Sequence, residues 1–214
     1  MKKLTVLLAL VMISQFIFAQ RRFGIRAGLN IANQKISAKY MGEKNTQHGK
    51  AIPSFHLGAM GDLQLNDFLS LQTSLILTGK GANFEAADSM GNPTTAKLRP
   101  FYIELPIALV YKHSLPTTNA TIYGGVGPAL AFGVFGKAKT GSESQDAFQK
   151  EGFKRFDLGL NLTAGLELPT GLQFSFHFSP GLINIANIQD PDVDINWKNE
   201  VVGFSFGYFL THRK

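Results

Sequence analysis

The chain of 214 residues contains no cysteine, so neither a disulfide framework nor lipid attachment to a cysteine is open to it. Only 17% of its residues are charged, and no cluster of lysine and arginine is longer than a pair such as Arg21-Arg22. Nucleic-acid recognition needs a basic patch or stripe, so we expect no nucleic-acid partner. The sequence also lacks Pro/Ser-rich linkers and low-complexity tracts. These absences favour one domain, which we place at residues 20–214.

Long apolar runs are missing except at the N-terminus. Residues 1–19 combine the basic start Met1-Lys2-Lys3, an apolar stretch from Leu4 to Phe18 and the small residue Ala19. This pattern predicts a cleavable secretory signal, because its apolar core is shorter than the about 20 residues that a spanning helix needs. Its removal would lower the formal net charge from +6 to +4. No later stretch approaches 18 apolar residues, so we predict no transmembrane helix.

Apolar and polar residues alternate along most of the remaining chain. In residues 155–168, for example, leucines at even positions alternate with Asp157, Gly159, Asn161 and Thr163. A period of two indicates β-strands, since helical spacing would scatter the leucines over both faces. Eight such stretches occur, at residues 23–31, 54–64, 69–80, 99–112, 120–134, 155–168, 172–182 and 200–210.

The composition of the two strand faces distinguishes a membrane barrel from a soluble one. A soluble exterior carries charge on roughly a quarter or more of its positions. Here the less apolar face holds mainly Gly, Ala, Ser, Thr, Asn and Gln, whereas the apolar face is rich in Leu and Phe. Small polar residues suit the narrow lumen of an eight-stranded barrel, and the strands reach the about 9–11 residues that cross a bilayer. We therefore predict an all-β, eight-stranded antiparallel up-and-down transmembrane β-barrel with a filled lumen.

The connections between the strands alternate in length. Long connections fall at residues 34–53, 81–98, 135–154 and 183–199, and short ones at 65–67, 113–119 and 169–171. In outer-membrane barrels the short turns are periplasmic and the long loops extracellular. We therefore expect both chain ends in the periplasm. Pro106 and Pro128 lie inside neighbouring strands, where each removes a ladder donor, and we predict a β-bulge at each.

Several segments resemble one known family. They are the start at Phe23-Gly-Ile-Arg-Ala-Gly-Leu-Asn, the segment Tyr102-Ile-Glu-Leu-Pro-Ile-Ala-Leu, the segment Tyr123-Gly-Gly-Val-Gly-Pro-Ala-Leu, and Phe156-Asp-Leu-Gly-Leu-Asn-Leu. Together they resemble the PorT-type outer-membrane β-barrel family of Bacteroidetes, over essentially the whole mature chain. The resemblance implies a small barrel in the outer membrane of a Gram-negative bacterium. One branch of that family is implicated in protein secretion and gliding, and the resemblance fixes no reaction.

Charged and histidine side chains on the polar face are candidates for a functional site. An ion or proton path is one interpretation, and a buried network of ion pairs that fills the interior is the other. We favour the network, because unpaired charge in a narrow lumen is costly. Arg26 is expected to pair with Glu104 or with a carboxylate of the 155–168 strand. The predicted network comprises Arg26, His56, Asp62, Lys80, Glu104, Arg155, Asp157, Glu167 and His177.

The sequence also contains a candidate catalytic pair. His177 and Ser179 lie two residues apart, the spacing that small outer-membrane lipid A deacylases use. Both would face the lumen, where a lipid ester could not reach them, so we predict polar filling and no catalytic residue.

The last long connection contains Asp190, Asp192, Asp194 and Asn196 at the spacing of a calcium loop. Ile195 replaces the turn glycine of such a loop and Glu200 comes one residue early, so we predict an acidic solvated loop. Neither a metal nor a cofactor is predicted. Trp197 is expected in an interfacial aromatic girdle. The first connection is basic, and we expect it to be solvated or to meet lipopolysaccharide phosphates through Lys35, Lys39, Lys44 and Lys50.

From these features we predict a structural, surface-interaction or assembly and secretion accessory protein with its activity in the loops. The alternatives are a lipid-modifying hydrolase of the outer membrane and a narrow pore. Expected partners are outer-membrane lipid, lipopolysaccharide and envelope proteins that meet the extracellular loops, and the barrel is expected to be monomeric.

Overall fold

The computed structural model describes residues 21–40, 43–87, 91–149, 152–187 and 193–210. The strands are β1 (Arg21–Tyr40), β2 (Glu43–His48), β3 (Ile52–Gln64), β4 (Leu69–Gly79), β5 (Asn83–Ala87), β6 (Pro93–Ser114), β7 (Thr121–Thr140), β8 (Glu143–Asp146), β9 (Phe156–Glu167), β10 (Leu172–Pro180) and β11 (Val193–Phe209). Within these residues the structure has no helix long and apolar enough to cross a membrane.

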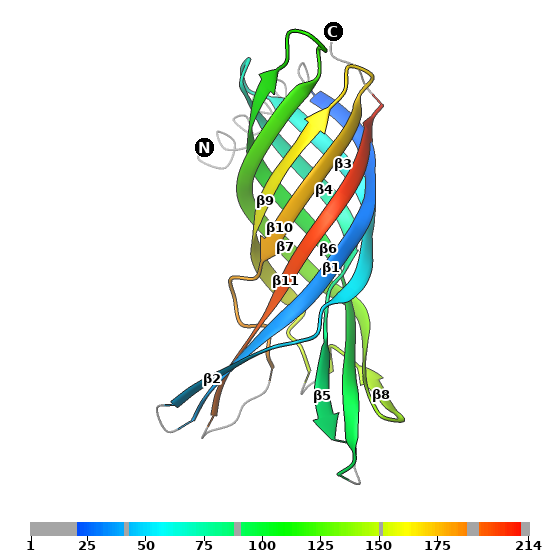
Figure 1. Ribbon diagram of the computed structural model, residues 1–214, viewed down its shortest axis with the longest axis vertical. Coiled ribbons are helices and arrows are strands. Elements are labelled where there is room, and N and C mark those ends of the chain that lie inside the picture. The colour runs from blue at the N-terminus through cyan, green and yellow to red at the C-terminus, as the bar shows by residue number, and fades with distance from the viewer. Residues whose placement is uncertain (1–20, 41–42, 88–90, 150–151, 188–192, 211–214) are drawn as a thin grey trace, which may run out of the picture.

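Eight of the strands close into a ring. β1, β3, β4, β6, β7, β9, β10 and β11 follow one another around it, each antiparallel to the next. β1 also pairs with β11, from Gly24 opposite Phe209 to Tyr40 opposite Val193, and this pairing closes the barrel. The predicted eight-stranded antiparallel up-and-down barrel is confirmed (Figure 1).

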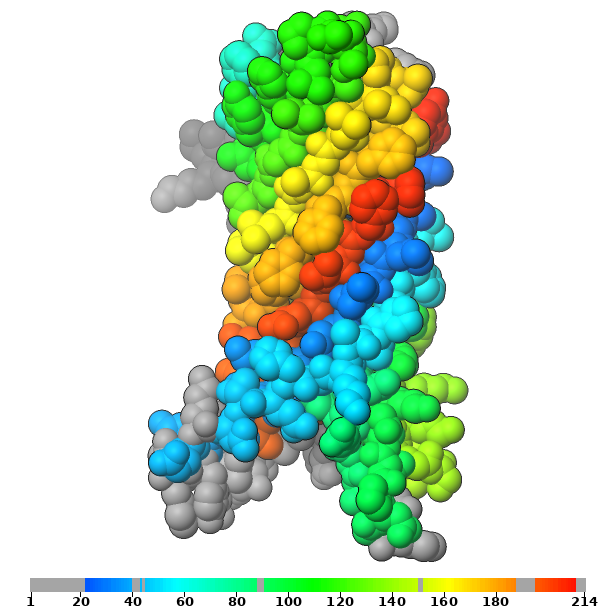
Figure 2. Space-filling view, in the orientation of Figure 1, coloured from blue at the N-terminus to red at the C-terminus, as the bar shows by residue number. Residues whose placement is uncertain are grey.

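The two ends of the barrel differ. One end carries the three short turns, such as the one in which Gly171 adopts a positive φ of 85° and Leu168 N–H bonds to Leu172 C=O. At the other end β2, β5 and β8 extend the sheet as hairpins with β1, β6 and β7 (Figure 1). The space-filling view shows these hairpins projecting beyond the barrel body as two separate prongs (Figure 2). The described chain enters β1 and leaves β11 at the short-turn end.

The outward face is apolar and the inward face polar, as predicted. Leu29 is 73% exposed and Phe206 is 52% exposed, whereas His56 is 1% exposed. Aromatic pairs lie near both ends of the outward face: Phe68 stacks on Tyr111 near the short turns, and Phe101 stacks on Phe135 near the long loops. An exposed apolar belt edged by aromatic rings suits contact with lipid hydrocarbon.

The predicted bulges at Pro106 and Pro128 are wrong. The register between β6 and β7 is the same on both sides of Pro106, and the β7–β9 ladder passes Pro128 without a shift. The one register shift between β6 and β7 lies at Phe101/Tyr102, where Val134 is the extra residue on β7. On the other side of β6, its ladder with β4 lacks the pairs nearest Pro106 but keeps its register. There Thr73 Oγ1 donates a hydrogen bond to the Pro106 carbonyl at 3.0 Å.

Candidate functional site

The lumen near the short turns holds four charged side chains. Arg22 Nη2 lies 2.7 Å from Asp62 Oδ2, and the same nitrogen lies 2.9 Å from Glu167 Oε2. Lys112 Nζ lies 2.6 Å from the other oxygen of Asp62. The guanidinium of Arg22 also lies 4.0 Å from the ring centre of Phe209. Two cations and two carboxylates therefore neutralise each other across the barrel.

A second charge cluster lies nearer the long loops. Lys80 Nζ is 2.7 Å from Glu104 Oε2 and 3.0 Å from Asp157 Oδ2. Asn199 Nδ2 donates to Asp157 Oδ2 at 2.9 Å, and Gln34 Nε2 donates to Asn199 Oδ1 at 2.8 Å. All five side chains are buried. With one lysine and two carboxylates, this cluster has a formal net charge of −1.

Between the two clusters lies a polar layer with one cation. Arg26 donates to the hydroxyls of three serines, at 3.2 Å to Ser74, 3.3 Å to Ser175 and 2.8 Å to Ser205. His56 contacts Asn30 through Nδ1 and Ser205 through Nε2, both at 2.8 Å. Over the three layers, the described residues supply four cations and four carboxylates. The cations are Arg22, Arg26, Lys80 and Lys112, and the carboxylates are Asp62, Glu104, Asp157 and Glu167.

Two glycines make room for this layer. A Cβ on Gly28 would lie within 3 Å of the His56 ring, and one on Gly203 would lie within 3 Å of the His177 ring. The two imidazole rings meet edge to face with their centres 5.1 Å apart. Glycine at these two inward positions therefore leaves the space that the histidine rings occupy.

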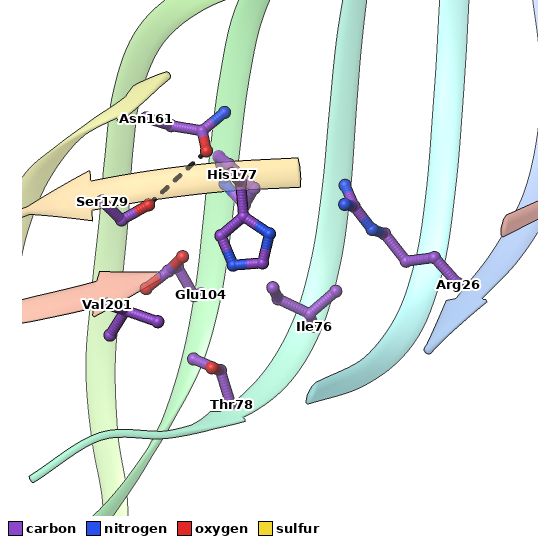
Figure 3. Close-up of a pocket in the computed structure, with 9 residues that line it drawn as sticks. Arg26, Ile76, Thr78, Glu104, Asn161, His177, Ser179 and Val201 are labelled. Carbon is purple, nitrogen blue, oxygen red and sulfur yellow. Dashed lines mark hydrogen bonds between the residues drawn. The ribbon is translucent and has the colours of Figure 1, made fainter. Parts of the chain in front are cut away.

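A small cavity remains beside this layer. It is lined by Arg26, Glu104, Asn161, His177 and Ser179 among others (Figure 3). Its volume is about 10 Å³, which is room for about one water molecule. A space of this size admits no organic substrate.

The long-loop end of the lumen is closed by an apolar plug. Phe84 of β5 and Phe153 of the β8–β9 connection pack edge to face on Trp197 of β11, with ring centres 5.5 and 4.9 Å apart. Phe148 packs in the same way on Tyr102 at 5.5 Å, and Ile185 is fully buried in the same cluster. Backbone hydrogen bonds tie the loops together, from Lys154 N–H to Ile185 C=O and from Ile185 N–H to Trp197 C=O. The expectation that Trp197 joins an outward girdle is therefore wrong, since its ring packs within this plug.

The structure brings eight of the nine predicted lumen residues into these layers. Arg155 lies outside them: it is exposed, it donates to the carbonyls of Gly133 and Val134, and its guanidinium lies 5.0 Å from the ring centre of Phe148. Arg155 precedes the first residue of β9, so the period-two argument did not apply to it. Sequence reasoning missed Arg22 and Lys112, although both continue the even-numbered inward positions of their strands.

The expected pairing of Arg26 is also wrong. Glu104 and Asp157 bind Lys80, and Glu167 binds Arg22. No carboxylate within the described ranges lies at salt-bridge distance from Arg26. The tilt of the strands sets which inward residues share a level, and the alternation pattern carries no information about it.

His177 and Ser179 face the lumen, as expected, and both are buried. Ser179 Oγ donates to Asn161 Oδ1 at 3.5 Å (Figure 3). Neither side chain reaches the outward face, so the inward placement that argued against a lipid esterase holds.

Of the acidic segment, Asp190 and Asp192 lie outside the described residues. Asp194 and Asn196 lie on β11, opposite Lys39 and Ser37 of β1. No cluster of three or more His, Cys, Asp or Glu suited to a metal occurs in the described part of the chain. Among the four lysines of the first connection, Lys50 forms an exposed ion pair with Glu85 at 3.0 Å.

Comparison with known proteins agrees with the fold. A family model described as "Outer membrane protein beta-barrel domain" matches residues 18–187. The outer membrane protein OprG from Pseudomonas aeruginosa is 14% identical over 91% of this chain and 97% of its own, with a TM-score of 0.52. The Neisserial surface protein A is 12% identical over 87% and 96% of the two chains, with a TM-score of 0.44. No curated protein matches the sequence.

Proposed function

Because the chain belongs to the outer membrane protein β-barrel domain family, we propose that it is a structural and surface-interaction protein of the outer membrane. In this role it serves as a scaffold or as an assembly and secretion accessory. Its partners are envelope proteins, which meet it at the long-loop end, while lipid surrounds its apolar belt. We propose that the barrel is a monomer, and the β1–β11 pairing supports this because it leaves no ring strand with an open edge for pairing with a second copy.

The filled lumen is the observation that carries this proposal. Charged side chains pair across the barrel in two clusters, and an apolar plug closes its long-loop end. The surface left for specific contacts is the set of hairpins formed by β2, β5 and β8. Loops that a rigid scaffold positions are the usual place for binding residues.

The orientation belongs to the proposal. In outer-membrane barrels the long loops face the outside and the short turns face the periplasm. This chain places its long hairpins at one end and both termini of the described barrel at the other. A protease-recognition sequence inserted between β7 and β8 should then be cut on intact cells, and one inserted between β9 and β10 should be protected. Cleavage in the opposite pattern would reverse the orientation.

Binding is tested by shortening the loops. We expect that replacing residues 84–96 and 138–152 by short turns abolishes capture of envelope proteins by the tagged barrel. The control is heat-resistant migration on a gel, which reports a closed barrel and should be retained. Undiminished capture by a closed, shortened barrel would contradict the proposal.

We propose neither a pore nor a hydrolase. A pore needs a continuous wet lumen, and a hydrolase needs His177 and Ser179 within reach of lipid. Planar-bilayer conductance at background level and unchanged lipid A in an expressing strain are the expected results. Conductance above background would establish the pore, and altered lipid A would establish the enzyme.

We infer further that the protein is of the PorT type found in Bacteroidetes. The supports are the Ile103-Glu-Leu-Pro106 segment of β6 and the Gly125-Val-Gly-Pro128 segment of β7. If it acts in the secretion and gliding branch, deleting its gene should reduce secreted protein and colony spreading. Normal secretion and spreading would exclude that branch.

A further inference from the structure

The β6–β7 ladder continues past the barrel body and carries cations in facing pairs on its outward side. Lys97 lies opposite Lys139, Arg99 lies opposite Lys137, and Phe101 lies opposite Phe135. Like charges directly opposite one another on neighbouring strands are destabilising. An external anion that bound between the strands would relieve this repulsion.

The chain supplies little acid to these four cations. Within the described ranges none of them forms an ion pair, and Arg99 uses one nitrogen to bind the Asn83 side chain at 3.1 Å and the Leu98 carbonyl at 2.9 Å. Asp146 of β8 lies opposite Lys137, and its Oδ1 accepts the Phe148 N–H at 2.7 Å. Among the described side chains that line this outward part of β6, β7 and β8, four are cations and one, Asp146, is a carboxylate.

These residues line an outward groove with an aromatic floor. The groove has a volume of about 500 Å³, and its lining includes all four cations together with Phe101, Phe135 and Asp146. The Phe101 and Phe135 rings stack with their centres 5.0 Å apart, and Phe55 packs on Phe101 at 5.6 Å. This floor continues toward the barrel body into the exposed apolar belt through Ile103 and Phe132.

We propose that this groove, here called the β6–β7 groove, binds a phosphorylated glycolipid of the outer leaflet, the lipid A part of lipopolysaccharide. Its phosphate lies between the Lys97/Lys139 and Arg99/Lys137 pairs, and an acyl chain runs along Phe101 and Phe135. Charge complementarity selects a phosphate, and continuity of the floor with the lipid-facing belt selects a lipid over a free anion. The assignment to the outer leaflet rests on the proposed orientation of the long loops.

The matched comparison is between two lysine sets at the same end of the barrel. The groove variant is Lys97→Gln/Lys137→Gln/Lys139→Gln. The control variant is Lys35→Gln/Lys39→Gln/Lys198→Gln, which removes the same charge from the β1–β11 extension, where Lys35 lies opposite Lys198 and Glu200 lies near His48 at 4.0 Å. Lys139→Gln alone is a milder variant if the triple substitution hinders folding.

Binding is measured by native mass spectrometry of the full barrel in detergent micelles, titrated with diphosphorylated lipid A. We expect the groove variant to weaken lipid A binding by about tenfold or more, because it removes three of the four groove cations, and the control to change it less than twofold. Equal losses in both variants would show nonspecific charge attraction or lipid binding at the basic first connection, and either result would overturn the proposal.

Two further titrations fix the ligand. Dephosphorylated lipid A should bind the unaltered protein about tenfold more weakly, and inorganic pyrophosphate should bind too weakly to saturate the groove. Saturation by pyrophosphate at the affinity of lipid A would overturn the lipid assignment. Phe101→Ala/Phe135→Ala should weaken lipid A binding and leave pyrophosphate unaffected. Because micelles have no inner or outer leaflet, these results do not depend on the orientation, which the protease sites test separately.

Discussion

The charged side chains inside the barrel are buried and balanced, whereas those of the β6–β7 groove are open to solvent and mostly positive. In the lumen the described residues include four cations and four carboxylates, and every one of these carboxylates has a cation at hydrogen-bond distance. In the groove four cations face one carboxylate in a space of about 500 Å³. Burial enforces neutrality in the first region, because an unpaired charge there is expensive. The second region is open, so its charge is available to a ligand.

Removing the charge of Lys80 should lower the stability of the barrel more than any other substitution proposed here. Lys80→Met leaves Glu104 and Asp157 buried without their cation, and we expect a loss of about 3–5 kcal/mol in unfolding free energy. Urea unfolding in lipid vesicles measures it. Adding Glu104→Gln and Asp157→Asn should restore most of the loss. If Lys80→Met alone were as stable as the unaltered protein, water would have to solvate the carboxylates of Glu104 and Asp157.

Crowding the middle layer should have the next largest effect. Gly203→Ala places a methyl group within 3 Å of the His177 ring and of Asn30 Oδ1, and we expect a loss of about 1–3 kcal/mol. The matched control is Gly124→Ala, whose Cβ would have only the Thr163 carbonyl within 4 Å, at 3.9 Å. The temperature at which gel mobility changes reports both variants. Equal shifts would contradict a packing role for Gly203.

Arg26 tests whether a lumen cation matters through its ion pairs, because it bonds to serine hydroxyls whereas Arg22, Lys80 and Lys112 bind carboxylates. Arg26→Met breaks hydrogen bonds to Ser74, Ser175 and Ser205 but strands no carboxylate within bonding distance. We therefore expect a loss of about 1 kcal/mol, well below that of Lys80→Met, in the same urea experiment. A loss as large as that of Lys80→Met would mean that Arg26 balances Glu104 through the field of the lumen.

The groove should show the smallest effect on stability. Lys139→Gln removes one of two facing cations, and we expect a change within about 0.5 kcal/mol, in the stabilising direction. The same urea titration measures it, with Lys39→Gln as the control. A clear destabilisation would show that Lys139 holds the extension together rather than serving a ligand.

The sequence predicted the barrel because its signal is local. Alternation in each strand, such as that of residues 155–168, fixes which side chains face inward, and it placed eight of the nine predicted lumen residues correctly. It did not identify partners. Arg22 binds Glu167 across the lumen, and Lys112 binds Asp62, through strand tilt and stagger that alternation does not encode.

The other wrong predictions concern the position of Trp197 and of the β-bulge, which lie beyond the regular part of the barrel or at an irregular point of a ladder. Trp197 lies on β11 beyond the barrel body, where loop side chains fold inward over it, so its general preference for interfaces was overridden by packing against Phe84 and Phe153. The bulge lies at Val134, which no proline marks. The groove escaped sequence reasoning because Lys97 and Lys139 become neighbours only through the β6–β7 register.

The seam between β1 and β11 joins segments from opposite ends of the chain, from Gly24 with Phe209 onward. The seam is held without a covalent link, by the backbone ladder and by side-chain hydrogen bonds such as those from Arg26 to Ser205 and from Gln34 to Asn199. A chain that ended before β11 (Val193–Phe209) would leave β1 and β10 each with an unpaired edge. Pairing of the last strand with the first is therefore the contact that closes the barrel.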